Sequence, residues 1–163
     1  MWTIYGQDHL LKRLEASLQQ QRQSHAYLLC GPPHVGKMAL AINISQAVNC
    51  LEGPGIPCGS CTQCTRIAQG HHADVRVLYP GQGEEFGWPK TMIGLEAIKE
   101  TLRVVNLNPY EGSTSVVIID GAESMSDEAA NALLKTLEEP PPHAMFLLLT
   151  ANDEAVLTTV QSL

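Results

Sequence analysis

The stretch from Gly31 to Met38 constrains this chain most, because it carries nearly all the features of a phosphate-binding loop. Two glycines at this spacing let successive backbone N–H groups point at phosphate oxygens, and Lys37 adds a positive charge. A short apolar run, 26–30, precedes the loop and a helical pattern, 37–49, follows it. This strand–loop–helix context predicts a nucleotide-binding α/β domain. The candidate phosphate ligands are Gly31, Pro32, Pro33, His34, Val35, Gly36, Lys37 and Met38.

Met38 departs from the usual pattern of such a loop. Ser or Thr normally follows the lysine, because its hydroxyl coordinates the Mg²⁺ that accompanies the nucleotide. A methionine side chain cannot do this. We therefore expect ATP to bind weakly, with little gain from Mg²⁺.

Composition places the chain among globular proteins and argues against some partners. Its 163 residues, 44% of them hydrophobic, are enough for one compact domain. The net charge of −7, without a long run of one sign, does not favour tight direct binding to a nucleic-acid backbone. The sequence has neither a membrane-spanning apolar run nor a signal peptide, which predicts a cytoplasmic protein with no membrane partner.

Four of the five cysteines gather in an insertion, 50–64, that is rich in Gly and Pro. Cys58, Cys61 and Cys64 have two residues between neighbours, and Cys50 lies at the end of the preceding helical pattern. Four thiolates with no open position predict a structural Zn²⁺ site. Two alternatives are four unrelated thiols and an iron–sulfur cluster, although the spacing matches neither ferredoxin pattern. Cys30, in the apolar run, is expected in the core, and His71 and His72 are expected to be solvated.

Polar residues follow two further apolar runs. The run 116–119 ends at Asp120, as expected of a buried strand that delivers a carboxylate to the C-terminal edge of a parallel sheet, where it would reach Mg²⁺ through water. The run 145–150 leads to Asn152, which we expect either near a γ-phosphate or in a structural turn. Helical patterns lie between the strands, so we predict a three-layer fold with a mostly parallel central sheet.

Three stretches together resemble one family, the bacterial clamp-loader subunits of DNA polymerase III in the AAA+ superfamily. The segment 131–141, Asn-Ala-Leu-Leu-Lys-Thr-Leu-Glu-Glu-Pro-Pro, is similar to the family's most recognisable segment. The four-cysteine insertion is similar to its zinc module, and 25–29 resembles its first strand. The resemblance implies that residues 1–163 form the AAA+ nucleotide-binding domain, including the zinc module 50–64, at the start of a longer subunit. It also implies lid and collar domains that this chain lacks.

Within that family, the departures imply a lost activity. The hydrolysing tau/gamma subunits have Asp-Glu where this chain has Asp120-Gly121, so the water-positioning glutamate is missing. Glu123 follows closely, but from a turn it is not expected to match that geometry. Leu163 stands where the family's arginine finger is expected. Together with Met38, these changes argue against efficient phosphoryl transfer, and no catalytic residue is assigned.

The resemblance therefore implies a delta-prime type subunit, a largely non-hydrolysing stator that helps to load the sliding clamp onto primed DNA. Its expected partners are tau/gamma and delta type subunits and, through the assembly, the clamp and DNA, so any nucleotidyltransferase activity belongs to the complex. The alternative is a tau/gamma type ATPase, since Lys37 and Asp120 are present. A small-molecule kinase would leave 131–141 and the cysteines unexplained.

Overall fold

Four parallel strands form the central sheet of the computed structural model, which describes residues 1–82 and 91–160, with side chains up to residue 156. The strand order is β1-β4-β3-β2. Cys30 pairs with Thr150 and Asp120 with Leu149, so three strands end at the same edge of the sheet. The strands are β1 (Ala26–Cys30), β2 (Val75–Leu78), β3 (Ser115–Asp120) and β4 (Ala144–Thr150).

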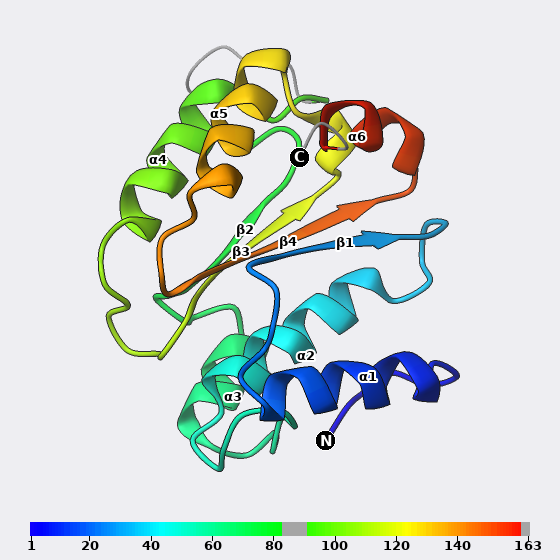
Figure 1. Ribbon diagram of the computed structural model, residues 1–163, viewed down its shortest axis with the longest axis vertical. Coiled ribbons are helices and arrows are strands. Elements are labelled where there is room, and N and C mark those ends of the chain that lie inside the picture. The colour runs from blue at the N-terminus through cyan, green and yellow to red at the C-terminus, as the bar shows by residue number, and fades with distance from the viewer. Residues whose placement is uncertain (83–90, 161–163) are drawn as a thin grey trace.

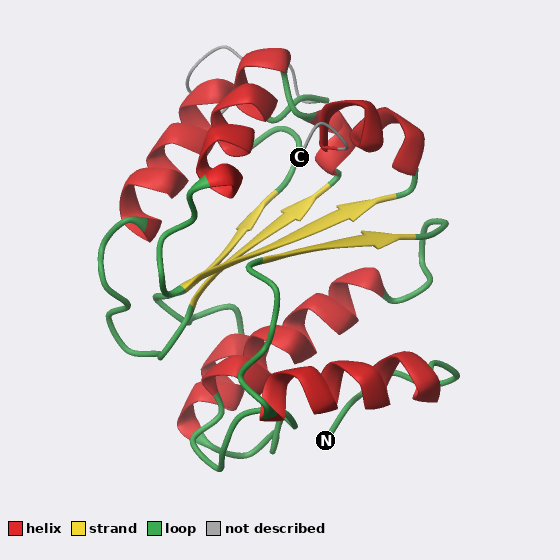
Figure 2. Ribbon diagram, viewed as in Figure 1, coloured by secondary structure: helices red, strands yellow, loops and turns green. Residues whose placement is uncertain are grey.

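Helices cover both faces of this sheet and complete the predicted three-layer α/β fold. On one face lie α1 (Asp8–Gln19) and α2 (Lys37–Asn49), and on the other α4 (Leu95–Val105) and α5 (Asp127–Glu138) (Figure 1). The short helix α3 (Thr62–Ala68) packs beside α2. The 3-10 helix η2 (Ala122–Ser124) and α6 (Asp153–Val160) lie beyond the C-terminal ends of the strands (Figure 2).

The two middle strands are buried on both faces, which explains their continuous apolar sequence. In β3, Val116 and Ile118 pack toward α1 and α2, while Val117 and Ile119 pack toward α4 and α5. Every residue of β4 is buried. A parallel strand covered by helices on both sides has no solvent-facing position, so the polar–apolar alternation of a half-exposed strand is absent. The predicted central sheet is confirmed.

Helix α5 begins and ends where its sequence signals predict. The Ser126 hydroxyl accepts a hydrogen bond from the Ala129 N–H at 3.1 Å, which caps the first turn. Asp127 and Glu128 place negative charge at the positive end of the helix. The helix ends at Glu138, two residues before Pro140, because the residue before a proline is driven out of helical geometry.

Cys30 was expected in the core, and this is wrong: its thiol is exposed, because β1 is the end strand of the described sheet and the chain there turns into the phosphate loop. The expected arginine-finger position, Leu163, lies outside the described residues. In the part of the chain that the structure describes, no helix has the length and apolar character needed to cross a membrane.

Candidate nucleotide site and metal centre

The phosphate loop joins β1 to α2 and is tied to the neighbouring strand. The Gly31 N–H donates to the Thr150 carbonyl at 3.2 Å, which extends the β1–β4 pairing by one residue. Gly36 precedes the first residue of α2 with a φ of +91°, a left-handed conformation that favours glycine. His34 is also left-handed, with a φ of +64°. The loop thus has the curled backbone that the glycine spacing predicts, at the N-terminus of a 13-residue helix.

Lys37 lies folded back over the loop. Its Nζ donates to the carbonyl oxygens of Gly31 at 2.6 Å and Pro32 at 2.8 Å. These bonds hold the positive charge at the mouth of the loop, where a phosphate would meet it. A phosphate ligand would compete with these two carbonyls for the ammonium group.

The Met38 side chain is half-buried and packs against the core. It contacts the apolar cluster that α1, α2 and one face of the sheet build together, which includes Leu14, Leu40 and Val116. The position that would carry the Mg²⁺-binding hydroxyl in a complete phosphate loop therefore contributes to packing in this chain. The backbone N–H is the one group of Met38 that could donate a hydrogen bond to a phosphate.

Asp120 and Gly121 lie at the same sheet edge as the loop. Asp120 is the last residue of β3, and its side chain is exposed. Gly121 follows with a φ of +83° and ψ of +53°. A residue with a Cβ is strained in that left-handed conformation, by about 1 kcal/mol or more. The backbone after Asp120 is thus poorly suited to the glutamate that hydrolysing relatives are expected to carry there.

Glu123 and Thr150 meet between Asp120 and the loop. The Thr150 hydroxyl, at the end of β4, donates to Glu123 Oε2 at 2.7 Å and accepts from the Asn152 N–H at 3.0 Å. From the sequence we predicted only an apolar run over 145–150, and this pair was not expected. The sequence does contain one indication of this pair. Glu123 follows the end of β3 by three residues, and a turn that short keeps an acidic side chain close to the neighbouring strand, β4.

Asn152 lies just beyond β4 and caps the next helix. Its Oδ1 accepts a hydrogen bond from the Ala155 N–H at 3.3 Å in the first turn of α6. An asparagine side chain at this position satisfies a helical N–H that has no intrahelical partner. This hydrogen bond gives Asn152 a local structural role, and its place near a γ-phosphate stays a prediction.

The four clustered cysteines meet in one place, as their spacing predicts. The Sγ atoms of Cys50, Cys58, Cys61 and Cys64 all lie within 4.8 Å of one another, with Cys58 and Cys64 at 3.9 Å. Four thiolates around one Zn²⁺ at the usual bond length of about 2.3 Å are separated by about 3.8 Å. The cluster therefore has the size of a single-ion site and can hold a metal ion.

Backbone N–H groups support two of these sulfurs. Cys58 Sγ accepts from the N–H groups of Cys61 at 3.2 Å and Ser60 at 3.4 Å, and these bonds lower the pKa of Cys58 to about 6. Cys61 Sγ accepts from the Cys64 N–H at 3.4 Å. Burial raises the pKa of Cys64 to about 12. The lowered pKa favours the thiolate form of Cys58, whereas Cys64 favours the thiol. A bound metal cation would stabilise the thiolate form of all four cysteines.

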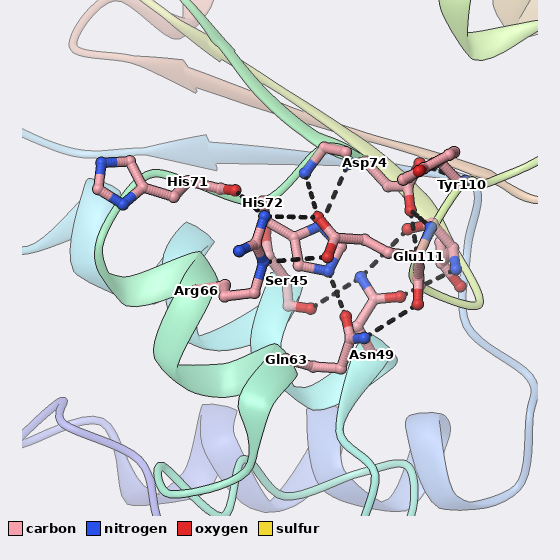
Figure 3. Close-up of polar contacts among 12 residues, drawn as sticks. Ser45, Asn49, Gln63, Arg66, His71, His72, Asp74, Tyr110 and Glu111 are labelled. Carbon is pink, nitrogen blue, oxygen red and sulfur yellow. Dashed lines mark hydrogen bonds and ion pairs between the residues drawn. The ribbon is translucent and has the colours of Figure 1, made fainter.

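His72 lies in a buried polar network (Figure 3). The prediction that His71 and His72 are both solvated is therefore wrong for His72, whereas His71 is exposed. Its Nδ1 accepts from the Asp74 N–H at 3.1 Å, and its Nε2 donates to Gln63 Oε1. Gln63 precedes the metal-ligand candidate Cys64. Burial lowers the pKa of His72, and the nearby Glu111 only partly opposes this. A neutral imidazole thus joins the cysteine module to β2.

Asp74 anchors the loop between α4 and β3, a role that the sequence did not reveal. Its carboxylate accepts three backbone N–H groups, from Tyr110, Glu111 and Gly112, each at 2.7 Å. Burial alone would raise the pKa of Asp74, but these three bonds outweigh it and the pKa is lowered. Asn49, next to Cys50, holds the following residues through N–H bonds from Ser113 and Thr114 at 2.9 Å.

Comparison with known proteins identifies the family to which this arrangement belongs. A family model described as DNA polymerase III, delta subunit, matches residues 6–163. The chain belongs to this family. The resemblance inferred from 131–141 and the cysteine insertion is therefore confirmed. The match spans the phosphate loop, the cysteine cluster and the Glu123–Thr150 pair alike.

Relatives of two kinds in this DNA polymerase III family match at nearly equal identity. The chain is 36% identical over 160 residues to subunit tau of Bacillus subtilis, covering 98% of this chain and 27% of the relative. It is 36% identical over 152 residues to subunit delta' of Escherichia coli, covering 93% of this chain and 44% of the relative. The chain thus spans less than half the length of these relatives.

Solved structures agree with the AAA+ fold. A DNA polymerase III gamma subunit-related protein of Thermotoga maritima superposes with a TM-score of 0.63 at 26% identity, covering 96% of this chain and 43% of that one. A RuvB mutant of the same species superposes with a TM-score of 0.54 at 17% identity, covering 96% and 43%. The second likeness concerns the fold alone.

Proposed function

We propose that this chain is the AAA+ module of a delta-prime type clamp-loader subunit of DNA polymerase III, acting as a largely non-hydrolysing stator. One observation carries the proposal: the backbone after Asp120 is left-handed at Gly121, where a water-positioning glutamate would be strained. Without that carboxylate, an attacking water lacks its general base or orienting group.

Two further contacts support weak or absent hydrolysis. The carboxylate of Glu123, the nearest acid in the chain that could replace the missing glutamate, accepts a hydrogen bond from the Thr150 hydroxyl. The half-buried Met38 side chain packs against the core and offers no Mg²⁺ ligand. Phosphoryl transfer depends almost wholly on positioned charges and donors, so these losses act on the same step.

Nucleotide binding without turnover is part of the proposal. The loop backbone from Gly31 to Gly36 and the Lys37 ammonium retain what a triphosphate needs. We expect weak ATP affinity that Mg²⁺ improves little. Calorimetric titration with ATP, with and without Mg²⁺, measures both, and a large gain from Mg²⁺ would contradict the role assigned to Met38.

For the four-cysteine cluster we propose one structural Zn²⁺ per chain. The Sγ separations fit one tetrahedral ion better than a multi-iron cluster, which needs its ligands farther apart. A closed site of this kind contributes folding energy and no chemistry. Elemental analysis of the purified chain tests the assignment: one zinc is expected, while iron, or no metal, refutes it.

The partners follow from the family and stay proposals: tau/gamma and delta type subunits and, through the assembly, the sliding clamp and primed DNA. Reconstitution of the complex tests the stator role. With Lys37→Ala in this subunit alone, the ATPase rate of the assembly should stay within about twofold, because the hydrolysing sites lie in other subunits. The same substitution in a tau/gamma subunit is the control and should lower the rate strongly.

The alternative is a tau/gamma type ATPase. It is favoured by the tau relatives, which match at the same identity as the delta' relatives, and by the presence of Lys37 and Asp120. In the reconstitution above, a loss of ATPase activity from Lys37→Ala in this subunit would select this alternative.

A further inference from the structure

The four cysteines of the candidate metal centre come from two separate parts of the fold. Cys50 directly follows the last residue of α2. The other three lie on the turn before α3 or on α3 itself: Cys58, Cys61 and Cys64. Because the four Sγ atoms lie within 4.8 Å of one another, one bound ion would join the end of α2 to α3. Cys50 is the ligand that the end of α2 would supply.

The three sulfurs on the α3 side accept hydrogen bonds from backbone N–H groups. Cys58 Sγ accepts two, from Cys61 at 3.2 Å and from Ser60 at 3.4 Å. Cys61 is the N-cap residue of α3, and its Sγ accepts from the Cys64 N–H at 3.4 Å. Cys64 Sγ accepts from the Gly59 N–H. Each of these bonds stabilises negative charge on the sulfur that accepts it.

The sulfur of Cys50 has a different environment. The backbone N–H groups that donate to this cluster go to the other three sulfurs, and within the described residues none donates to Cys50 Sγ. Cys50 is also the C-cap residue of α2, a helix of 13 residues. The C-terminal end of a helix carries partial negative charge, which disfavours a second negative charge beside it. Cys50 would therefore be the least stabilised thiolate of the four.

With a metal bound, this difference decides which sulfur reacts. The cation holds all four cysteines as thiolates, so the ionised fraction no longer ranks them. The ranking then follows intrinsic nucleophilicity, which is lower for a better stabilised thiolate, and access to the reagent. Cys64 is 0% exposed, whereas the other three are half-buried. Access thus separates only Cys64 from the rest, and the hydrogen bonds separate Cys50 from Cys58 and Cys61.

We propose that Cys50 is the modification site of the metal centre, the ligand that reacts first with a soft carbon electrophile. Its sulfur attacks the electrophilic carbon, the new S–C bond forms, and the bond to the leaving group breaks with its electron pair on that group. The product is an uncharged thioether, a weaker metal ligand than a thiolate. The inference rests on the structural Zn²⁺ proposed above, and it assigns to Cys50 a reactivity that the other three ligands lack.

The experiment maps alkylation of the zinc-bound chain by iodoacetamide, whose iodide is the leaving group. Cys30→Ser is used throughout, because the exposed Cys30 thiol lies outside the cluster and would compete for the reagent. Zinc content is counted first, less than one equivalent of reagent is added, and tandem mass spectrometry locates the label. Cys50 should be labelled about threefold or more faster than Cys58, Cys61 or Cys64.

Two controls test the cause of the preference. In guanidinium chloride with a chelator, the helices and N–H bonds are lost, so the four cysteines should react at rates within about twofold of one another. Ser60→Ala removes a hydroxyl that lies 3.7 Å from Cys58 Sγ but keeps the Ser60 backbone N–H. In that variant Cys50 should still be labelled first.

Three results would overturn the proposal. One is a zinc-bound chain in which Cys58 or Cys61 is labelled as fast as Cys50. Another is a preference for Cys50 that persists in the unfolded chain, which would assign it to the local sequence. The third is a change of the first labelled residue to Cys58 in Ser60→Ala, which would assign the protection of Cys58 to the hydroxyl. A chain that contains no zinc would refute the structural Zn²⁺ itself, so the zinc count tells that failure apart from these.

Discussion

The Thr150 hydroxyl donates a hydrogen bond to the Glu123 carboxylate at 2.7 Å and thereby joins the end of β4 to the turn after β3. Thr150 is 1% exposed, and its carbonyl accepts the first N–H of the phosphate loop, from Gly31. The position of Glu123 is therefore fixed by the strand that also holds the loop. This hydrogen bond directs the Glu123 carboxylate toward the end of β4.

Replacing Thr150 with valine removes the hydroxyl and keeps the shape. We expect the free energy of unfolding to fall by about 1–2 kcal/mol, because Glu123 loses a donor and the Asn152 N–H loses its acceptor. Urea denaturation measures the change. Thr136→Val is the matched control, since that hydroxyl only reaches a carbonyl of its own helix, and it should change stability by less than about 0.5 kcal/mol.

Substitutions at Gly121 test whether its left-handed backbone disfavours residues that carry a Cβ. Gly121→Ala should lower the free energy of unfolding by about 1 kcal/mol or more, because alanine is strained at a φ of +83°. The added Cβ itself would meet only ordinary contacts with Pro80 and Ser124, so the loss comes from the backbone. Gly121→Asn should lose less, since asparagine tolerates this conformation. Equal losses for the two variants would point to crowding.

Gly121→Glu introduces the residue expected at this position in a hydrolysing relative. Its stability reports the backbone strain, and its ATP turnover reports the function. We expect it to be destabilised like Gly121→Ala and to gain no measurable ATP turnover, because Met38 still offers no Mg²⁺ ligand. ATP turnover produced by this single change would contradict the role assigned to Met38.

The lowered pKa of His72 predicts that the folded chain loses stability as the pH falls. Its pKa is lowered in the folded chain, so the unfolded chain binds a proton first as the pH falls below the ordinary value of about 6.5. The stability contributed by the neutral imidazole is present above that pH and is lost as the pH falls toward the folded pKa. Asp74, whose folded pKa is also lowered, adds a further loss only below about pH 4.

The measurement is the free energy of unfolding of wild type and His72→Asn between pH 8 and pH 5.5, with metal content monitored at each pH. The asparagine variant should be less stable at pH 8, because the contacts to Gln63 and the Asp74 N–H change. It should also depend less on pH. Parallel pH profiles for the two proteins would remove His72 as the titrating group.

Much of the fold could be predicted from the sequence because its signals are local. The glycines of the phosphate loop, the apolar β-branched run before Asp120 and the Ser126 cap each specify an element over a few residues. The cysteine spacing likewise predicted the cluster that the fold assembles. These features need no knowledge of distant contacts.

The errors and omissions involve contacts between residues far apart in sequence. Asp74 is committed to backbone N–H groups 36 to 38 residues away, and Glu123 to a hydroxyl 27 residues away. His72 is buried because α3, β2 and the 110–112 loop close around it, which the local sequence does not reveal. Cys30 is exposed because β1 is an end strand of the described sheet, and strand order is a property of the whole fold.

The central claim is that the chain keeps a phosphate loop but has lost hydrolysis. ATP turnover by the full-length subunit alone, purified with its metal and assayed with and without Mg²⁺, tests this most directly. The proposal predicts no Mg²⁺-dependent turnover above the background of a Lys37→Ala variant, because Met38 offers no Mg²⁺ ligand, Gly121 stands where the water-positioning glutamate is expected, and Glu123 is held by Thr150. Mg²⁺-dependent hydrolysis at about one per second or faster, lost in Lys37→Ala, would contradict it.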